Sequence, residues 1–243
     1  MRSIERPAAP VATMLHVGGW TARVAPWRRP GAVAHLVPVP GQRPPSVAEL
    51  REVLAELATL GYADVLTTAL AAGEQEPYRA TGFLVRQRLH LLEAGLHDLP
   101  RPAGGVRRVR RHDWPALVHV DHLAFDDFWR LDATGITEAV QATPSARLRA
   151  ATSDGRLVGY AVTGRSGRSG YVQRLAVDPS AQGRGVGSNL LMDGLRWLRA
   201  RGATSALVNT QVGNGRALAL YERHGFRSTG PGLAVLGRPV PPP

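Results

Sequence analysis

Three glycines stand at alternate positions where a strand pattern gives way to a helix pattern. They are Gly183, Gly185 and Gly187, within the stretch Val172–Asn189. Glycine lets the backbone approach an anion closely. The free N–H groups of a helix's first turn, at the positive end of the helix dipole, bind phosphate oxygens. The spacing therefore predicts a loop that binds pyrophosphate.

Residue types exclude two common phosphate loops. A dinucleotide fingerprint needs glycine at position 188, where this chain has serine, and a kinase-type phosphate loop needs lysine. All 30 basic residues are arginine, and cysteine is absent. The chain therefore has no Schiff-base lysine, no cysteine nucleophile, no disulfide and no thiolate metal site. We expect no bound metal.

The elements that position this loop alternate between strand and helix patterns. Asp154-Gly155 is typical of a tight hairpin turn, and Asp113 is expected to cap a helix with Pro115 in its first turn. The patterns indicate a domain that is α+β or α/β. We expect strands at 106–110, 146–152, 157–164, 171–177 and 205–210, helices after 113 and at 127–141, 187–201 and 215–223, and a closing hairpin at 226–236.

The first half contains a weaker version of the same ending. A helix pattern at Val47–Leu60 ends at Gly61, strand patterns follow at Ala63–Ala69 and Leu84–Leu91, and Gly82-Phe83 lies between them. We interpret this as an internal duplication whose first copy has degenerated, with chance similarity as the alternative. A linker composition at Leu99–Gly105 then suggests domains at 1–100 and 105–237.

Composition narrows the functional classes. The chain has 243 residues, 44% of them apolar, which is typical of a globular protein. No apolar run approaches the ~18 residues of a membrane span. The amino-terminal residues resemble a signal peptide poorly, so we expect a cytoplasmic protein.

The positive charge lies in the second half. Residues 1–100 contain 10 arginines and 9 acidic residues, whereas residues 101–243 contain 20 arginines and 10 acidic residues. A nucleic acid or a polyanionic cofactor such as coenzyme A would be attracted there. A GC-rich genome that encodes surface cations as arginine explains the same bias without a function.

The pattern Gln182-x-x-Gly185-x-Gly187, placed between a strand and a helix, resembles the acetyl-CoA loop of the GNAT N-acetyltransferase superfamily. Leu175-Ala-Val177 resembles that family's fourth strand, and Tyr221-Glu-Arg-His-Gly-Phe226 resembles its signature ending. The ending is most similar to that of the ribosomal-protein alanine N-acetyltransferases. The resemblance covers residues 105–237 and implies a mixed sheet flanked by helices, preceded here by a smaller degenerate GNAT-like α/β half without a cofactor loop.

The resemblance also implies roles for individual residues. The backbone of Leu175, Ala176 and Val177 would bind the pantetheine arm where two strands splay apart, and Asn214 would bind the cofactor near that arm. Tyr221 would protonate the departing thiolate, although a packed core tyrosine explains it too. The pyrophosphate would be held by the amides of Gly183, Arg184, Gly185, Val186, Gly187 and Ser188, bordered by Gln182 and Arg184.

The general base is where the chain departs from its relatives. They carry glutamate where Asn209 stands, and an amide cannot accept a proton at neutral pH. Deprotonation of an amine would then pass through water held by Asn209 or through another residue. The available candidates, none of them favoured, are Asp126, Asp127, His112, His119 and His122.

The resemblance places acceptor recognition at about Ala124–Arg130 and Thr229–Leu233. An apolar wall of aromatic residues beside Asp126 and Asp127 would seat a cationic amine, or would be core residues with an acidic cap. The aromatic residues are Phe125, Phe128 and Trp129. The sequence does not identify the acceptor, the role of the first half or the oligomeric state.

The resemblance thus implies an acetyl-CoA-dependent N-acetyltransferase that acts on an amine, either a protein N-terminus or a small molecule, by direct attack in a ternary complex. One alternative is a tandem GNAT of the mycothiol-synthase type, for which the first half is short. Another is an arginine-rich nucleic-acid-binding module, which the absence of interleaved aromatic residues disfavours. We expect no membrane partner and no nucleic-acid partner.

Overall fold

The computed structural model describes residues 12–27, 32–97, 99–100 and 104–242. These residues form two compact units. Unit 1 consists of the described residues within Met1–Leu89 and Pro231–Pro243, and unit 2 of those within His90–Gly230. These units are groups of residues that contact one another, and they do not test which residues descend from which copy of a duplication. The domain ranges 1–100 and 105–237 therefore stay a proposal.

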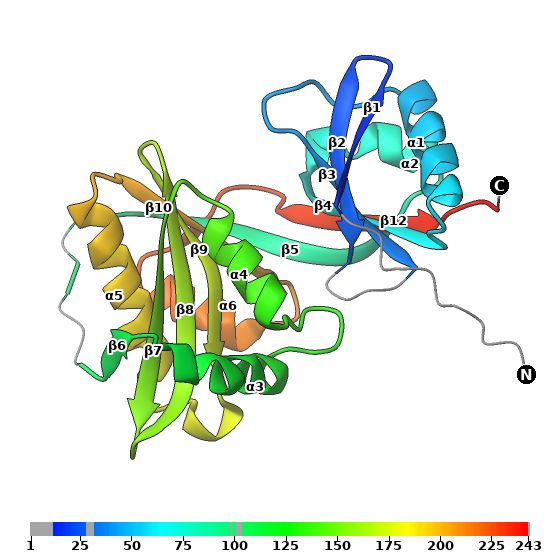
Figure 1. Cartoon of the computed structure of the whole chain (residues 1–243). Helices are drawn as coiled ribbons and strands as arrows, with labels where there is room; N and C mark the ends of the chain where they lie inside the picture. The colour runs from blue at the N-terminus through cyan, green and yellow to red at the C-terminus, as the bar shows by residue number, and fades with distance from the viewer. Residues whose placement is uncertain (1–11, 28–31, 98, 101–103, 243) are drawn as a thin grey trace, which may run out of the picture. The chain divides into compact units, whose positions relative to one another are not determined.

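Unit 1 contains six neighbouring strands in the order β1-β2-β3-β4-β12-β5 (Figure 1). The first three strands pair antiparallel, β3 and β4 pair parallel, and β12 is antiparallel to both of its neighbours. The core includes Trp20, Leu36 and Phe83. The elements are β1 (Thr13–Val17), β2 (Trp20–Pro26), β3 (Val33–Pro38), α1 (Val47–Thr59), β4 (Asp64–Ala71), η1 (Ala72–Glu74), α2 (Glu76–Ala80), β5 (Leu84–Gly95) and β12 (Leu233–Pro239).

The expected hairpin at 226–236 is wrong. Its first strand, β11 (Arg227–Ser228), pairs with β5 at Glu93 and Leu92, within unit 2. Its second strand, β12, inserts between β4 and β5 of unit 1. The prediction assumed that two strands close in sequence pair with each other. After the break at Gly230-Pro231-Gly232, β12 pairs with β4 and β5 instead.

Unit 2 contains the strand order β5-β10-β9-β8-β7-β6, with β11 also on β5. Its central pair, β9 and β10, is parallel, and β6 to β9 are antiparallel. The remaining elements are β6 (Val106–Arg108), η2 (Arg111–Asp113), α3 (Trp114–Ala124), α4 (Ala133–Gln141), β7 (Ser145–Ser153), β8 (Arg156–Ser166), β9 (Ser169–Val177), η3 (Pro179–Ala181), α5 (Val186–Ala200), β10 (Ser205–Gln211) and α6 (Gly215–Arg223).

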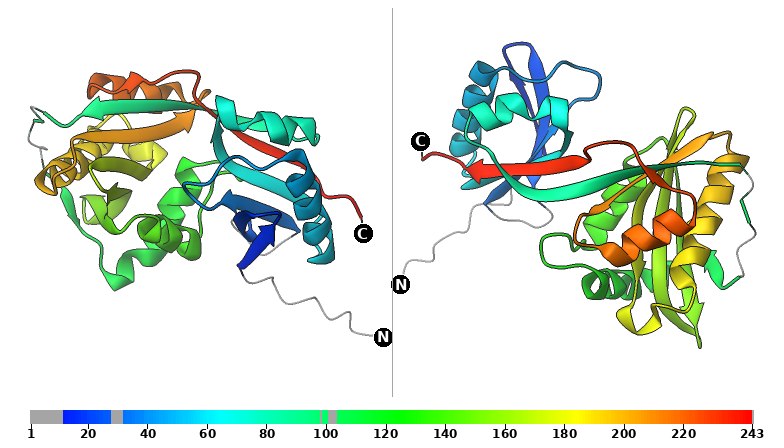
Figure 2. Two further views of the ribbon diagram at one scale, coloured as in Figure 1. Left: turned by 90° about the horizontal axis from the view of Figure 1, so that it is seen from above. Right: turned by 180° about the vertical axis from the view of Figure 1, so that it is seen from behind.

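Helices cover both faces of the unit 2 sheet, as the views in Figure 2 show. On one face α3 and α4 pack through Leu117 and Ile136 against Tyr160 of β8. On the other face α5 and α6 bury a separate cluster that includes Leu195 and Phe226. The mixed sheet flanked by helices that the sequence indicated is therefore confirmed.

Local signals account for most element boundaries. The β7–β8 turn has Asp154 and Gly155 at φ values of 51° and 75°, the left-handed region that a tight hairpin needs. The second helix is shorter than expected, because Asp132 caps α4 by accepting a hydrogen bond from the Gly135 N–H. Asp113 makes no such cap on α3, since its carboxylate binds Arg107 and the Arg110 N–H instead.

The two units share one local arrangement. In unit 1 the Phe83 N–H donates to the Tyr78 carbonyl, and in unit 2 the Phe226 N–H donates to the Tyr221 carbonyl. The two rings of each pair lie close, with centroids 5.4 Å apart in unit 1 and 5.6 Å in unit 2. In each unit this turn accompanies a parallel strand pair, β3–β4 or β9–β10. This likeness supports the proposed duplication.

Candidate functional site

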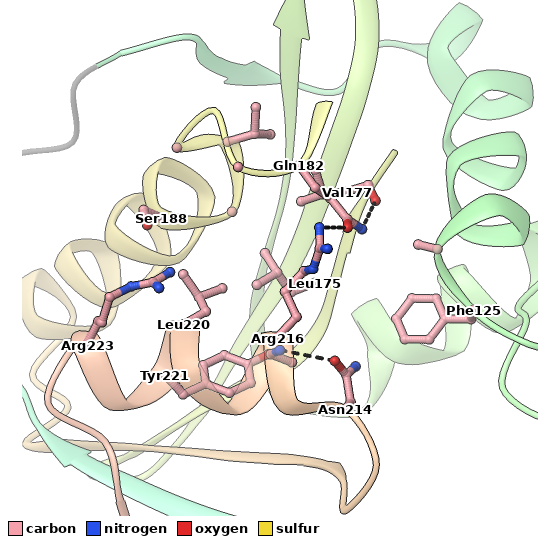
Figure 3. A pocket seen from close by; sticks show the side chains of 16 residues that line it. Phe125, Leu175, Val177, Gln182, Ser188, Asn214, Arg216, Leu220, Tyr221 and Arg223 are labelled. Atoms are coloured by element: carbon pink, nitrogen blue, oxygen red, sulfur yellow. Dashed lines mark hydrogen bonds between the residues drawn. The ribbon is translucent and has the colours of Figure 1, made fainter. Parts of the chain in front are cut away.

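Unit 2 contains a cavity of about 430 Å³ that is bounded by the end of α3, the end of β9, the glycine loop and α6. Figure 3 shows its side chains. The residues that line it are Ala124, Phe125, Leu175, Val177, Gln182, Gly183, Gly185, Val186, Gly187, Ser188, Asn214, Arg216, Ala217, Leu220, Tyr221 and Arg223.

The cavity adjoins a place where two parallel strands separate. The ladder between β9 and β10 runs only from Ser169–Ser205 to Tyr171–Leu207. Both strands continue beyond it, to Val177 and Gln211. The last residues of β9 therefore have no ladder partner on β10, which leaves this edge of β9 available for an extended ligand. This separation was expected from the resemblance.

Backbone conformation explains two of the three loop glycines. Gly183 and Gly185 have φ values of +78° and +79°, and a Cβ on either would meet nothing within 4 Å. Glycine is thus needed there for the left-handed backbone and not for space. Gly187 differs, because a Cβ there would lie 3.3 Å from Leu220 and 3.7 Å from Val177. Its requirement comes from close packing at the cavity wall.

The first turn of α5 has no side-chain cap. Gly185 is the N-cap residue and carries no side chain that could accept a hydrogen bond. Its carbonyl accepts the Asn189 N–H, while the amides of the first turn have no carbonyl one turn earlier in the helix. These amides and the positive end of the helix dipole face a cavity lined by Gly187 and Ser188. The chemistry of this donor set fits a phosphate group.

Polar side chains surround this end of the cavity. The Gln182 side chain donates to the Val177 carbonyl at 3.2 Å and accepts a hydrogen bond from Arg216 of α6 (Figure 3). His224 and the Ser188 hydroxyl lie 3.0 Å apart. Burial lowers the pKa of His224, and the neighbouring charge of Arg223 lowers it further.

Asn214 holds the start of α6. Its Oδ1 accepts a hydrogen bond from the Ala217 N–H at 3.0 Å, and its Nδ2 lies 3.4 Å from Gln211 Oε1. The residue also lines the cavity. A helix cap therefore explains this asparagine at least in part, and any cofactor contact would be made by the same side chain.

Tyr221 lies on α6 two turns after Asn214 and lines the same cavity. It is 5% exposed. Burial raises the pKa of Tyr221 well above its ordinary value, and the positive charge of Arg174 offsets part of this effect. The hydroxyl therefore keeps its proton at neutral pH, which a proton donor requires.

Three of the residues named for the site lie off the cavity. Ala176 is buried in the cluster under α3 and contributes no lining side chain, as expected if only its backbone acts. Arg184 and Asn209 are exposed and do not line the cavity. The other named residues are brought together there, and the roles assigned to all of them stay proposals.

The candidate bases and the second acceptor segment also lie off the cavity lining. Asp126 accepts a hydrogen bond from the Trp129 N–H, and Asp127 pairs with Arg130. The histidines considered above and the segment Thr229–Leu233 do not line the cavity. Among the described residues that do, none is acidic.

Sequence reasoning missed several lining residues. Ala217 lies three residues after Asn214 and four before Tyr221, so helical periodicity from those two residues could have found it. Leu220 and Arg223 lie at other angles around α6, and this periodicity does not predict them. Phe125 belongs to the segment expected to recognise the acceptor. Nothing in the sequence apart from its positive charge indicated that Arg216 would line the cavity.

Two further searches of the described part of the chain gave negative results. No group of three or more histidine, aspartate or glutamate side chains is placed to hold a metal ion. No helix in that part is long and apolar enough to cross a membrane.

Comparison with known proteins decides the family. The model described as "Acetyltransferase (GNAT) family" matches residues 106–226. A mycothiol acetyltransferase from Mycobacterium sp. (strain JLS) is 33% identical over 225 residues, which cover 79% of this chain and 74% of that protein. The chain belongs to the GNAT acetyltransferase family.

Other relatives match this GNAT protein over less of their length. The mycothiol acetyltransferase of Thermomonospora curvata is 32% identical over 169 residues, 66% of this chain and 57% of that protein. The one from Clavibacter michiganensis subsp. michiganensis is 33% identical over 153 residues, 59% of this chain and 50% of that protein. The chain thus spans about half the length of these two relatives.

A solved structure shares the fold of this GNAT protein. It is a tandem GNAT protein from the clavulanic acid biosynthesis pathway, with a TM-score of 0.70 and 15% identity. The match covers 97% of this chain and 86% of that one. At this identity the likeness shows the fold alone.

Proposed function

We propose that this GNAT protein transfers the acetyl group of acetyl-CoA to an amine in unit 2. One observation carries the proposal. A parallel strand pair separates beside a cavity, and the same cavity contains the uncapped start of α5 behind the glycine loop. An extended arm that ends in a pyrophosphate matches both features, because the free strand edge binds the arm and the first-turn amides bind the phosphates.

Binding and orientation are the first tasks of the chain's residues. The backbone of Leu175–Val177 would hold the pantetheine arm, and the amides of Gly183–Ser188 would hold the pyrophosphate. Arg216 and Arg223, which line the cavity, supply positive charge for the phosphates. Acetyl-CoA itself supplies an acetyl group activated as a thioester.

The transfer forms a C–N bond and breaks a C–S bond. A neutral amine attacks the thioester carbon, a backbone amide near Val177 stabilises the charge on the carbonyl oxygen, and the Tyr221 hydroxyl donates its proton to the leaving thiolate. The proton lost by the amine leaves through water. No acidic side chain lies among the described lining residues, and Asn209 is exposed and lies off the lining. The route we propose is therefore a chain of water molecules that leads from the cavity toward Asn209.

The relatives favour one acceptor class. The chain is 33% identical to a protein named mycothiol acetyltransferase over most of both chains. We therefore propose that the acceptor is a small-molecule amine of the thiol-pathway type rather than a protein N-terminus.

Two measurements test the proposal. Calorimetric titration with acetyl-CoA, at two salt concentrations and against a single-stranded oligonucleotide, separates cofactor binding from nucleic-acid binding. A panel of amines, which includes amino sugars, aminothiols and alanine-terminated peptides, is then screened for release of free CoA. Saturable acetyl-CoA binding with amine-dependent CoA release is expected. Oligonucleotide binding without acetyl-CoA binding would overturn the proposal.

A further inference from the structure

A buried ion pair joins α3 to β9 behind the cavity wall. The Arg174 guanidinium donates two hydrogen bonds to the Asp121 carboxylate, Nε to Oδ2 at 2.8 Å and Nη2 to Oδ1 at 2.7 Å. Asp121 is fully buried and Arg174 is 9% exposed. The paired bonds fix the plane of the guanidinium relative to the carboxylate.

Other groups complete this pair. The Tyr160 hydroxyl donates to Asp121 Oδ2 at 2.5 Å, and the Leu131 N–H donates to Oδ1 at 2.7 Å. Arg174 Nη2 also donates to the Trp129 carbonyl at 2.8 Å. A buried ion pair of this kind often adds no stability over apolar residues of the same volume. Stability alone therefore does not explain why this ion pair lies beside the cavity.

Arg174 lies directly against an aromatic residue of the cavity. Its guanidinium carbon is 3.4 Å from the centroid of the Phe125 ring, the distance of a stacked cation–π contact. Phe125 lines the cavity, on the side opposite to Ser188 and Arg223 (Figure 3). If the phosphates bind near Ser188, as proposed above, Phe125 lies at the opposite end of the cavity, where the acceptor would bind.

The contacts form a chain that leads from a residue outside the cavity to one inside it. Asp121 fixes Arg174, Arg174 lies over the ring of Phe125, and Phe125 presents an apolar surface to the cavity. The neighbouring carboxylates of Asp126 and Asp127 bind the Trp129 N–H and Arg130. An apolar contact, and not a carboxylate, is therefore the feature that this wall offers to an acceptor.

We propose that Asp121 is a positioning residue for acyl transfer, which acts through Arg174 to hold Phe125 as the wall against which the apolar part of the acceptor packs. The inference rests on the proposed function. Asp121 and Arg174 touch neither substrate, whereas Phe125 touches the acceptor.

The kinetic test compares Asp121→Asn with a matched ion-pair variant. Asp193 of α5 pairs with Arg147 of β7 at 2.8 Å and does not line the cavity. Asp193→Asn thus removes a strand-to-helix ion pair of the same unit. Both variants are expected to unfold at lower temperature. Only Asp121→Asn should raise the acceptor KM, by about tenfold or more, because misplacement of a substrate wall acts on acceptor binding. Its acetyl-CoA Kd should stay within about twofold.

A spectroscopic test needs no activity. The chain has four phenylalanines, so 4-fluorophenylalanine labelling gives four fluorine resonances, and Phe125→Leu assigns one of them. Asp121→Asn should shift and broaden the Phe125 resonance, and Asp193→Asn should leave it unchanged. If the wild-type protein releases no CoA with any amine, the proposed function is wrong. The fluorine spectra still show whether Asp121 holds Phe125 in place, because they require no turnover.

Three results would overturn the inference. They are an unchanged Phe125 resonance in Asp121→Asn, an equal change of that resonance in both variants, or an acceptor KM that Asp121→Asn leaves unchanged or that Asp193→Asn raises equally. If Asp121→Asn does not fold, Tyr160→Phe takes its place. That change removes one hydrogen bond to Asp121 and keeps the ion pair, so it should move the same resonance and the same KM by less.

Discussion

The Ser46 hydroxyl accepts a hydrogen bond from the Glu49 N–H, and the Glu49 carboxylate accepts one from the Ser46 N–H at 2.7 Å. This capping box closes the start of α1 in unit 1. In unit 2 the helix that follows the glycine loop, α5, has no such cap. One helix start is thus open to an anion, and the other already holds a carboxylate that would repel a phosphate.

We therefore predict one acetyl-CoA per chain, bound in unit 2. Unit 1 has a cavity of about 160 Å³ beside β3 and β4, against about 430 Å³ in unit 2. Pro44 and Pro45 line the smaller cavity and supply no amide donors. Calorimetric titration should give a stoichiometry of one, which Arg43→Ala in unit 1 should leave unchanged. A stoichiometry of two would contradict the prediction.

Substitution of the loop glycines should abolish acetyl-CoA binding. Gly185→Val places a β-branched side chain at a φ of +79°, directly before the first-turn amides, and Gly187→Val crowds Leu220 across the cavity wall. Gly155→Val is the matched control, since Gly155 has a φ of +75° in the β7–β8 turn and no neighbour within 4 Å of a Cβ. All three variants carry a local cost in stability, but the control should keep the wild-type acetyl-CoA Kd. Tight binding by folded Gly185→Val would count against the loop as the phosphate site.

Tyr221→Phe should lower kcat and change acetyl-CoA affinity little. The change keeps the ring against Phe226 and removes one proton donor, which typically costs ~10²–10⁴-fold in rate. A thiolate leaves readily, so we expect the lower end of that range. Tyr78→Phe removes the corresponding hydroxyl of unit 1, and its kcat should equal that of the wild type. Unchanged turnover in Tyr221→Phe would return the residue to a packing role, and lost binding would make it a cofactor contact.

Part of the acid stability should depend on Glu49. The hydrogen bond from the Arg43 side chain, with that from the Ser46 N–H, lowers the pKa of Glu49 to about 2. An unfolded glutamate titrates near ~4.3. The stabilisation is therefore complete above about pH 4.3 and is lost as the pH falls toward 2, where the unfolded chain binds the proton first. Melting temperatures of Glu49→Gln and of the wild type, measured from pH 5 to 2, should converge toward the acid end. Curves that stay parallel would contradict this.

Local signals in the sequence account for much of the fold and of the cavity. The glycines at 183 and 185 are required by a left-handed backbone, and the 3.6-residue period fixes which side of α6 carries Asn214 and Tyr221. Such features depend on neighbours within one or two turns of the chain. They can therefore be predicted from residue type and spacing.

Long-range pairings could not be predicted in this way. Asp121 and Arg174 are separated by 53 positions, and each alone has the character of a surface residue. Burial of both follows only from the packing of α3 on β9. The position of β12 has the same origin, because both strands that it pairs with, β4 and β5, lie far earlier in the sequence.

The place of β12 in unit 1 has a consequence for synthesis on the ribosome. The strand lies between β4 and β5, and its residues are translated only after the whole of His90–Gly230. At ~5–20 residues per second, the earlier strands of unit 1 wait roughly 7–30 s for this neighbour, and β4 and the first part of β5 have no strand between them during that time. Unit 2 has all of its strands before that time. Unit 1 begins first along the chain, but it cannot complete its sheet until unit 2 has been translated.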